Sequence, residues 1–261
     1  MEALIHDIRC SVRALVKSPG FTLIAVLVIA LGIGASTAIF SAVNAILLRP
    51  MAYREADRIV VPVFTNASRN IERGSVAFAD YMDWKNEENL FEAVAVYRPQ
   101  DVTLTGAGDP VKVDAAQATE GYFAVSAVPP LIGRTFDARD GQGAAPTLVM
   151  SYRLWQRQYG GEPDIVGKPI TVNGRPYTVI GVMPADSQWP ADIDLWALVV
   201  PESLPDDVRL RRDNQIWRAV ARLKPGVTVE QANATLRTLA RRVEEQHPES
   251  RNGWSAGVIP L

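Results

Sequence analysis

The longest apolar segment of the chain lies near its N-terminus. Residues 21–48 contain no Asp, Glu, Lys or Arg over 28 consecutive positions. About 20 apolar residues are enough for an α-helix to cross the ~30 Å hydrocarbon core of a bilayer. The rest of the sequence contains no second segment of this kind. The pattern therefore predicts one transmembrane helix over residues 19–49, followed by a large water-soluble region.

The segment before this helix is amphipathic. Between residues 2 and 17, apolar side chains recur at helical spacing on one face. The opposite face carries the basic side chains His6, Arg9, Arg13 and Lys17. Basic residues opposite an apolar face favour a helix lying in the lipid headgroup region. We therefore predict a membrane-associated amphipathic helix over residues 1–18, which Ser18-Pro19-Gly20 ends.

A cleaved signal peptide is the alternative interpretation of this N-terminal region. Its apolar core would cover roughly 7–15 residues and end at a small-residue cleavage site. Ser36-Thr37-Ala38 resembles such a site, but the apolar run continues to Leu48, which favours a retained helix. Basic residues lie on both sides of the span, so the positive-inside rule leaves its orientation open.

Small residues recur every fourth position within the predicted span. They form a candidate helix-packing face of Ala30, Gly34, Ala38 and Ala42. In membranes, such a ladder lets a second helix backbone approach closely. Small residues are also common in membrane helices for reasons of composition alone. We nevertheless expect this face to contact other transmembrane helices, supplied by another segment or by a second copy.

Beyond residue 50, short β-type runs alternate with a few helical patterns. The expected strands cover residues 58–64, 93–97, 101–105, 111–117, 146–150, 170–172, 177–182, 216–223 and 254–261. Helices are expected over 77–88, 121–125 and 151–159 and after Thr228. Strict strand–helix alternation is absent from the sequence pattern, which favours an α+β fold.

Three local signals in this region are specific. Asn173-Gly174 between two β-type runs predicts a hairpin, because both residues accept the positive φ angles of a type I′ turn. Ser151 precedes a helical pattern and is expected to cap it. Thr228 and Gln231 have the spacing of a capping box that opens a long helix.

Charge and cysteine content narrow the functional classes. The chain has a formal net charge of −2, and residues 50–261 carry four more acidic than basic side chains. This balance provides no electrostatic footprint for nucleic acid. Cys10 is the single cysteine, so the large region contains no disulfide.

The sequence contains no convincing catalytic, cofactor or metal motif. Its two histidines lack neighbours at metal-ligand spacing. Ser151 lacks the flanking glycines of a nucleophile elbow, and Pro169 follows Gly167-Lys168 where a phosphate-binding loop needs Ser or Thr. Three carboxylate pairs are expected to be solvated turn residues, namely Asp137/Asp140, Asp192/Asp194 and Asp206/Asp207. We expect no enzyme activity, metal or cofactor in this chain.

Several longer motifs resemble one known arrangement. They are FSAVNAILLRPMAY (40–53), GRTF (133–136), SYRLWQRQYGG (151–161), VGKPITVNGRPYTVIGVMP (166–184) and DLW (194–196). Together they resemble the amino-terminal half of MacB/FtsX-like ABC transporter permeases, especially the duplicated orphan permeases of acidobacteria. The resemblance covers the predicted span and the whole region after it.

The resemblance implies a division of the chain. Residues 1–18 would lie on the cytoplasmic membrane face, 19–49 would cross the bacterial inner membrane, and 50–261 would form a MacB-like periplasmic core. Within that core, a porter-like layer would comprise about 50–91 and 206–261, with a β-rich lobe inserted over about 92–205. Strand 58–64 and the segments after Ile216 would then share one sheet near the bilayer.

The resemblance also implies partners. Family permeases carry three further membrane helices, and they transmit ATP binding by a partner ABC ATPase into movement of the periplasmic domain. We therefore expect the chain to be either a fragment or a truncated permease, which requires the remaining permease helices or a second permease copy. The competing hypothesis is a signal-anchored binding or adaptor module, which needs no other membrane helix. A membrane-tethered hydrolase using Ser151 ranks third.

Overall fold

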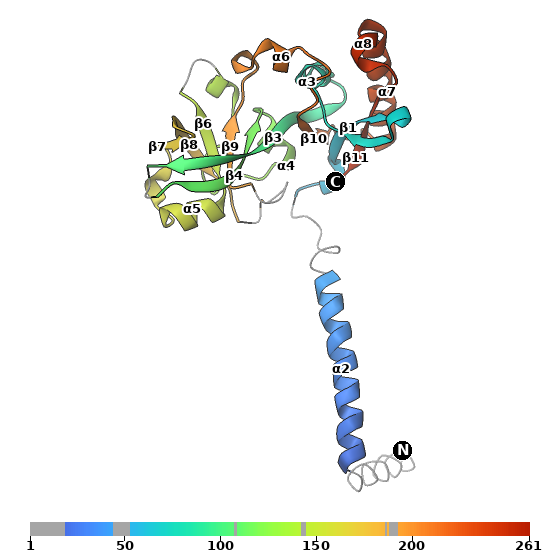
Figure 1. The fold of residues 1–261 in the computed structure, drawn as a ribbon, viewed down its shortest axis with the longest axis vertical. Coiled ribbons are helices and arrows are strands. Elements are labelled where there is room, and N and C mark those ends of the chain that lie inside the picture. Colours follow the sequence, from blue (N-terminus) through green and yellow to red (C-terminus); the bar gives the residue numbers. More distant parts are fainter. Residues whose placement is uncertain (1–18, 44–52, 107–108, 142–144, 186, 188–192) are drawn as a thin grey trace. The chain divides into compact units, whose positions relative to one another are not determined.

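The computed structural model describes residues 19–43, 53–106, 109–141, 145–185, 187 and 193–261. The chain forms two compact units, Met1–Met51 and Ala52–Leu261. The described part of the first is helix α2 (Pro19–Val43; Figure 1), which contains no charged residue. Among the helices of the described residues, none meets the length and hydropathy required to cross a membrane. The predicted span therefore stays a prediction, and the predicted helix 1–18 lies outside the described residues.

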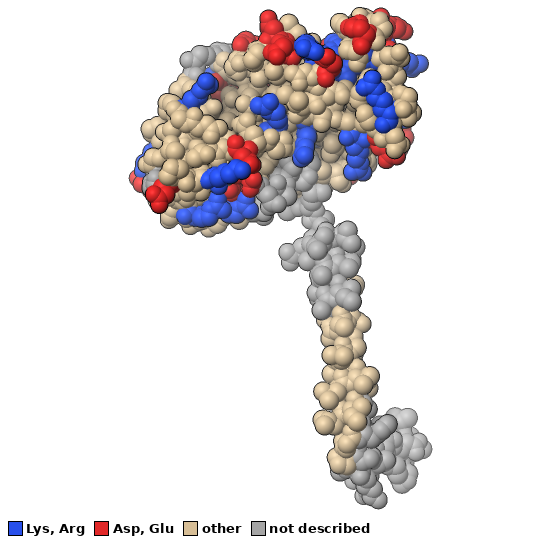
Figure 2. Space-filling view, in the orientation of Figure 1, with Lys and Arg blue, Asp and Glu red and all other residues tan. Residues whose placement is uncertain are grey.

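The second unit is built on one sheet of 11 strands. Its main path runs β11-β1-β10-β3-β4-β9-β6-β8-β5, in which the edge strand β5 covers Ile132–Gly133. Strand β2 (Ile71–Gly74) pairs with β1, and β7 (Pro169–Val172) pairs with β3 and β8. Strands and helices are mixed along the chain, which confirms the α+β prediction. Figure 2 shows acidic and basic side chains interspersed over the visible face of this unit.

One part of the sheet is an antiparallel layer covered by helices. It consists of β11 (Ser255–Pro260), β1 (Ile59–Asn66), β10 (Arg218–Leu223) and the first half of β3 (Phe91–Thr105). This pairing brings the predicted strand 58–64 beside the segments that follow Ile216. Helices α3 (Phe78–Lys85) and α7 (Val229–Gln246) contribute to one apolar cluster on this layer, which includes Phe78, Trp84, Trp217 and Leu236.

The second part of the sheet closes on itself as a six-stranded barrel. Starting from β3, its strands are β4 (Val111–Ala118), β9 (Leu195–Leu198), β6 (Thr147–Met150), β8 (Arg175–Val182) and β7, which returns to β3. Its interior side chains form a second cluster with helix α5 (Tyr152–Tyr159), whose Leu154 is fully buried. Strand β3 belongs to both parts and runs from one to the other (Figure 1).

A third cluster lies on the opposite faces of the same strands. Neighbouring residues alternate between clusters, as the period of two in a strand requires. Leu195 faces the barrel interior, whereas Trp196 packs with helix α4 (Tyr122–Ser126) in the third cluster. Strand β6 is therefore buried on both faces, whereas β7 has exposed or half-buried positions between its buried ones.

The three specific local signals are confirmed. The strands β7 and β8 form the expected hairpin, with φ of 47° at Asn173 and 77° at Gly174. The Ser151 side chain accepts a hydrogen bond from the backbone N–H of Leu154 and caps α5. Thr228 and Gln231 form a reciprocal capping box at the start of α7.

One prediction about elements is wrong. The runs 93–97 and 101–105 belong to a single strand, β3, which continues through Pro99. Strand β10 pairs with β3 only as far as Tyr97, and β7 pairs with it from Leu104. Pro99 therefore lies where β3 has a strand on one side only, so its missing N–H is tolerated. The helix expected over 77–88 is present and covers Phe78–Lys85, with Ala77 at its N-cap.

The prediction that all three carboxylate pairs are solvated is also wrong. Asp140 and Asp194 are buried, with side chains 3% exposed. Asp206 is exposed as expected, and Asp192 lies outside the described residues. Asp140 accepts hydrogen bonds from Arg134, six residues before it, whereas Asp194 accepts one from Arg153, which is 41 residues away.

Candidate functional site

A crevice opens at the carboxyl ends of two parallel strands. Strands β4 and β9 run side by side, and the chain leaves them in different directions. After β4 it enters α4, which belongs to the third apolar cluster, whereas after β9 it passes Val199 and Leu204, which pack with the helix-covered layer. Diverging connections at the carboxyl ends of parallel strands leave a gap that ligands commonly occupy. The crevice has a volume of about 380 Å³.

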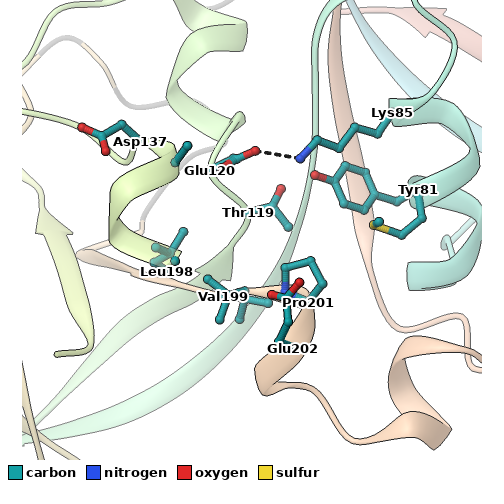
Figure 3. A pocket seen from close by; sticks show the side chains of 13 residues that line it. Tyr81, Lys85, Thr119, Glu120, Asp137, Leu198, Val199, Pro201 and Glu202 are labelled. Atoms are coloured by element: carbon teal, nitrogen blue, oxygen red, sulfur yellow. Dashed lines mark hydrogen bonds and ion pairs between the residues drawn. The ribbon is translucent and has the colours of Figure 1, made fainter. Parts of the chain in front are cut away.

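Four separate segments line this crevice (Figure 3). Helix α3 contributes Tyr81, Met82 and Lys85, the end of β4 contributes Thr119 and Glu120, and the 3-10 helix Ala138–Gly141 lies at one side. The end of β9 and the 3-10 helix Pro201–Ser203 complete the wall with Leu198, Val199, Val200, Pro201 and Glu202. No periodicity in the sequence links these segments, so sequence analysis missed the site.

An ion pair crosses the crevice from the helix-covered layer to the barrel. Lys85 Nζ lies 2.7 Å from Glu120 Oε1, and both side chains are about 40% exposed, at 43% and 40%. Partial burial acts against the charged lysine, but Glu120 and then Tyr81 and Glu202 raise the pKa of Lys85. Lys85 is therefore a cation at neutral pH, held by carboxylates on the opposite wall.

The other polar groups of the crevice have distinct environments. Burial raises the pKa of the Tyr81 phenol, and the nearby Thr119 side chain opposes this shift. Hydrogen bonds from Arg139 lower the pKa of Asp137 to about 2. Asp137 also lies 3.3 Å from Arg134, so its charge is compensated by two guanidinium groups.

Two buried carboxylates outside the crevice organise ion networks. Asp194 accepts hydrogen bonds from Arg153 Nε and Arg157 Nη2, each at 2.9 Å, which joins α5 to the start of β9. Asp80 of α3 pairs with Arg212 at 2.7 Å. It also pairs with Arg251 of helix α8 (Pro248–Arg251), and the side chains of Asp80 and Arg251 are both almost fully buried. Burial raises the pKa of Asp80, and the two arginines act in the opposite direction.

The motifs that carry the resemblance include two glycines at which backbone segments approach closely. A Cβ atom at Gly133 would lie 2.2 Å from the backbone oxygen of Ile180, and one at Gly181 would lie 2.2 Å from that of Arg134. Only glycine fits where two backbones approach this closely. The motif residues Arg153, Arg157 and Asp194 form the network described above, so these motifs specify packing.

The predicted helix-packing residues all fall within α2. Ala30 and Gly34 are exposed, and a Cβ atom built on Gly34 meets nothing within 4 Å. The side chains of Ala38 and Ala42 lie outside the description. In the described part of the chain, no group of three or more His, Cys, Asp or Glu is arranged to hold a metal ion.

Comparison with known proteins identifies the family. A family model described as the MacB-like periplasmic core domain matches residues 22–239. The chain belongs to this family. Its MacB/FtsX-like resemblance is thereby confirmed, and the match includes the barrel, the crevice and the helix-covered layer up to residue 239, without β11 and the end of α7.

Two curated relatives of this MacB-like domain are export proteins. The macrolide export ATP-binding/permease protein MacB of Rhodospirillum rubrum is 28% identical over 118 residues, which are 45% of this chain and 18% of that protein. The pyoverdine export ATP-binding/permease protein PvdT of Pseudomonas syringae pv. tomato is 27% identical over 111 residues, 42% of this chain and 17% of that protein. The match therefore spans less than a fifth of either relative.

Solved structures share the fold of this MacB-like domain. The periplasmic region of MacB from Actinobacillus actinomycetemcomitans has a TM-score of 0.56 at 14% identity, covering 78% of this chain and 89% of that one. The extracellular domain of the noncanonic ABC-type transporter YknZ from Gram-positive bacteria has a TM-score of 0.54 at 15% identity, covering 77% and 99%. At these identities the similarity concerns the fold.

Proposed function

We propose that this chain is the membrane-anchored periplasmic core of a MacB-like ABC transporter permease. It would couple ATP binding by a partner ATPase to conformational change outside the cytoplasm, for export. The observation that carries the proposal is the family match over residues 22–239. The domain itself would act mechanically, and nucleic acid is not a partner in this proposal.

The proposed membrane anchor is the segment 19–49. Support comes from 28 consecutive positions without a charged residue and from helix α2, whose described large apolar side chains are exposed. Exposed Leu, Ile and Val side chains at this density are stable in lipid and unfavourable in water. Residues 1–18 would lie on the cytoplasmic membrane surface, in contact with lipid.

The proposed contact with other membrane helices uses Ala30, Gly34, Ala38 and Ala42. Gly34→Leu together with Ala38→Leu is expected to weaken co-purification with the partner ATPase and the remaining permease helices. Gly32→Leu is the matched control, because residue 32 lies about 160° around the helix axis from Gly34. A side chain at residue 32 also has open space. Equal co-purification of both variants would contradict this packing face.

The proposed division of the core follows the two parts of its sheet. The helix-covered layer would be the porter-like part, about 50–91 and 206–261, and the barrel would be the inserted lobe, about 92–205. Supporting this, the layer and the barrel interior have separate apolar clusters. Strand β3 contributes to both clusters, so movement of the layer would be transmitted directly to the barrel.

Coupling can be tested in the assembled transporter. An engineered cross-link between the helix-covered layer and the barrel should uncouple ATP hydrolysis from export if relative movement of the two is required. Export and ATP hydrolysis would be measured before and after reduction of the cross-link. Undiminished export in the cross-linked state would contradict a mechanical role for this movement. A monomeric protein that functions without any ATPase would instead favour the signal-anchored adaptor.

A further inference from the structure

The crevice at the ends of β4 and β9 contains more negative than positive charge. Glu120 and Glu202 both act on Lys85, the one lysine that lines it. Glu120 is paired with Lys85, whereas no ion pair of the described residues involves Glu202. The third carboxylate, Asp137, and its neighbour Asp140 share Arg134 and Arg139, so four carboxylates stand against three basic side chains around the crevice. One additional cation would therefore balance the charge of the crevice.

The remaining wall is apolar and of limited size. Met82, Leu198, Val200 and Pro201 are half-buried and line the crevice, while Val199 is buried behind them. Its volume of about 380 Å³ lies within the range of about 300–1,000 Å³ that is typical of small-molecule sites. An apolar wall with a few charged groups at its edge favours a ligand that has one polar end.

We propose that this crevice binds a small organic amine, with the ammonium group at Glu202 and Glu120 and the apolar body against Met82, Leu198 and Val200. An anionic ligand is disfavoured, because it would approach two carboxylates while the nearby lysine is already paired. A neutral ligand would gain no charge–charge attraction from Glu202, which is exposed at the edge of the crevice. This inference does not depend on the proposed transport role, which would stand if the crevice proved empty.

The test uses the full chain in detergent and three ligands of similar shape. The probes are 2-phenylethylamine, 2-phenylethanol and 3-phenylpropionate, titrated by ligand-observed NMR. Saturable binding of the amine is expected, weakened about twofold to fivefold by Glu202→Gln, as for loss of one exposed ion pair. Glu245→Gln on α7 is the control, since this glutamate is exposed and lies outside the crevice. Because all variants share the same micelles, partition into detergent cancels between them.

A second variant tests whether the amine occupies the volume of the crevice, independently of the charge of Glu202. Val200→Trp should fill the crevice and abolish binding of the amine, provided that its thermal transition stays close to that of the wild type. Equal affinity for the amine and the alcohol would overturn the proposal, as would unchanged binding in Glu202→Gln or the absence of saturable binding. Tighter binding of the capped tripeptide acetyl-Leu-Lys-Leu-amide than of the amine would also overturn it, in favour of a protein partner.

Discussion

Asp194 is a buried carboxylate that holds helix α5 against the start of strand β9. Its side chain is 3% exposed, while its partners Arg153 and Arg157 are 41% and 48% exposed. Asp194→Asn keeps the shape but removes the charge, so one or both arginine hydrogen bonds weaken. We expect the free energy of unfolding to fall by about 1–3 kcal/mol, measured by urea denaturation.

The matched control for this substitution is Asp206→Asn. Asp206 is 76% exposed and pairs only locally, with Arg209 on the same short helix α6 (Asp206–Arg209). Its replacement is expected to change stability by less than about 0.5 kcal/mol. Equal effects of the two substitutions would show that burial of Asp194 contributes nothing to stability.

The lowered pKa of Asp140 predicts that the stability of the folded protein depends on pH in the acid range. Hydrogen bonds from Arg134, at 2.6 and 2.7 Å, lower its pKa below the usual 3.8, against the effect of burial. Because the folded state binds this proton more weakly than the unfolded state, the stabilisation is present above pH 3.8 and is lost as the pH falls below it.

Asp140→Asn removes this titration. Thermal melting temperatures of the wild type should therefore fall more steeply than those of the variant between about pH 4 and about pH 2. The variant is expected to be less stable near neutral pH, with the difference narrowing in acid. Parallel melting curves across this range would contradict the assignment. Asp137 titrates in the same window, with a pKa of about 2, and is retained in both proteins.

Helix α7 illustrates stability at the scale of one element. The Thr228 hydroxyl accepts a hydrogen bond from the Gln231 N–H, and the Gln231 side chain accepts one from the Thr228 N–H. Thr228→Ala removes one half of this capping box and should lower the free energy of unfolding by about 1 kcal/mol. Thr238→Ala is the control, because its exposed hydroxyl bonds only to Ala234 within the helix. A loss no greater than that of the control would exclude a capping contribution.

Elements with a local cause could be predicted from the sequence. The Asn173-Gly174 hairpin, the cap at Ser151 and the start of α7 each depend on residues within a few positions of one another. The continuity of β3 through Pro99 depends on where β10 and β7 stop pairing, which no local pattern encodes. The crevice and the burial of Asp194 likewise require segments far apart in sequence to meet.

On the scale of the whole second unit, β3 connects two structures with separate apolar interiors. Its first half pairs with β10 in the helix-covered layer, and its pairing with β4 extends from Tyr97 to Leu104 along the barrel. The partly exposed ion pair of Lys85 and Glu120 adds a second, weaker connection between the layer and the barrel. A substitution that destabilises the packing of either part therefore also destabilises β3, which both parts share.

This shared strand predicts that residues 52–261 unfold as one cooperative unit. Leu148→Ala in the barrel interior and Leu236→Ala on α7 each remove a fully buried side chain, and each should cost about 2–5 kcal/mol. If β3 couples the two interiors, both variants shift the same single transition, seen alike by far-UV circular dichroism and by tryptophan fluorescence. Trp217 reports on the layer and Trp196 on the opposite face of the barrel strands. Two transitions, each moved by only one of the substitutions, would show that the layer and the barrel fold independently.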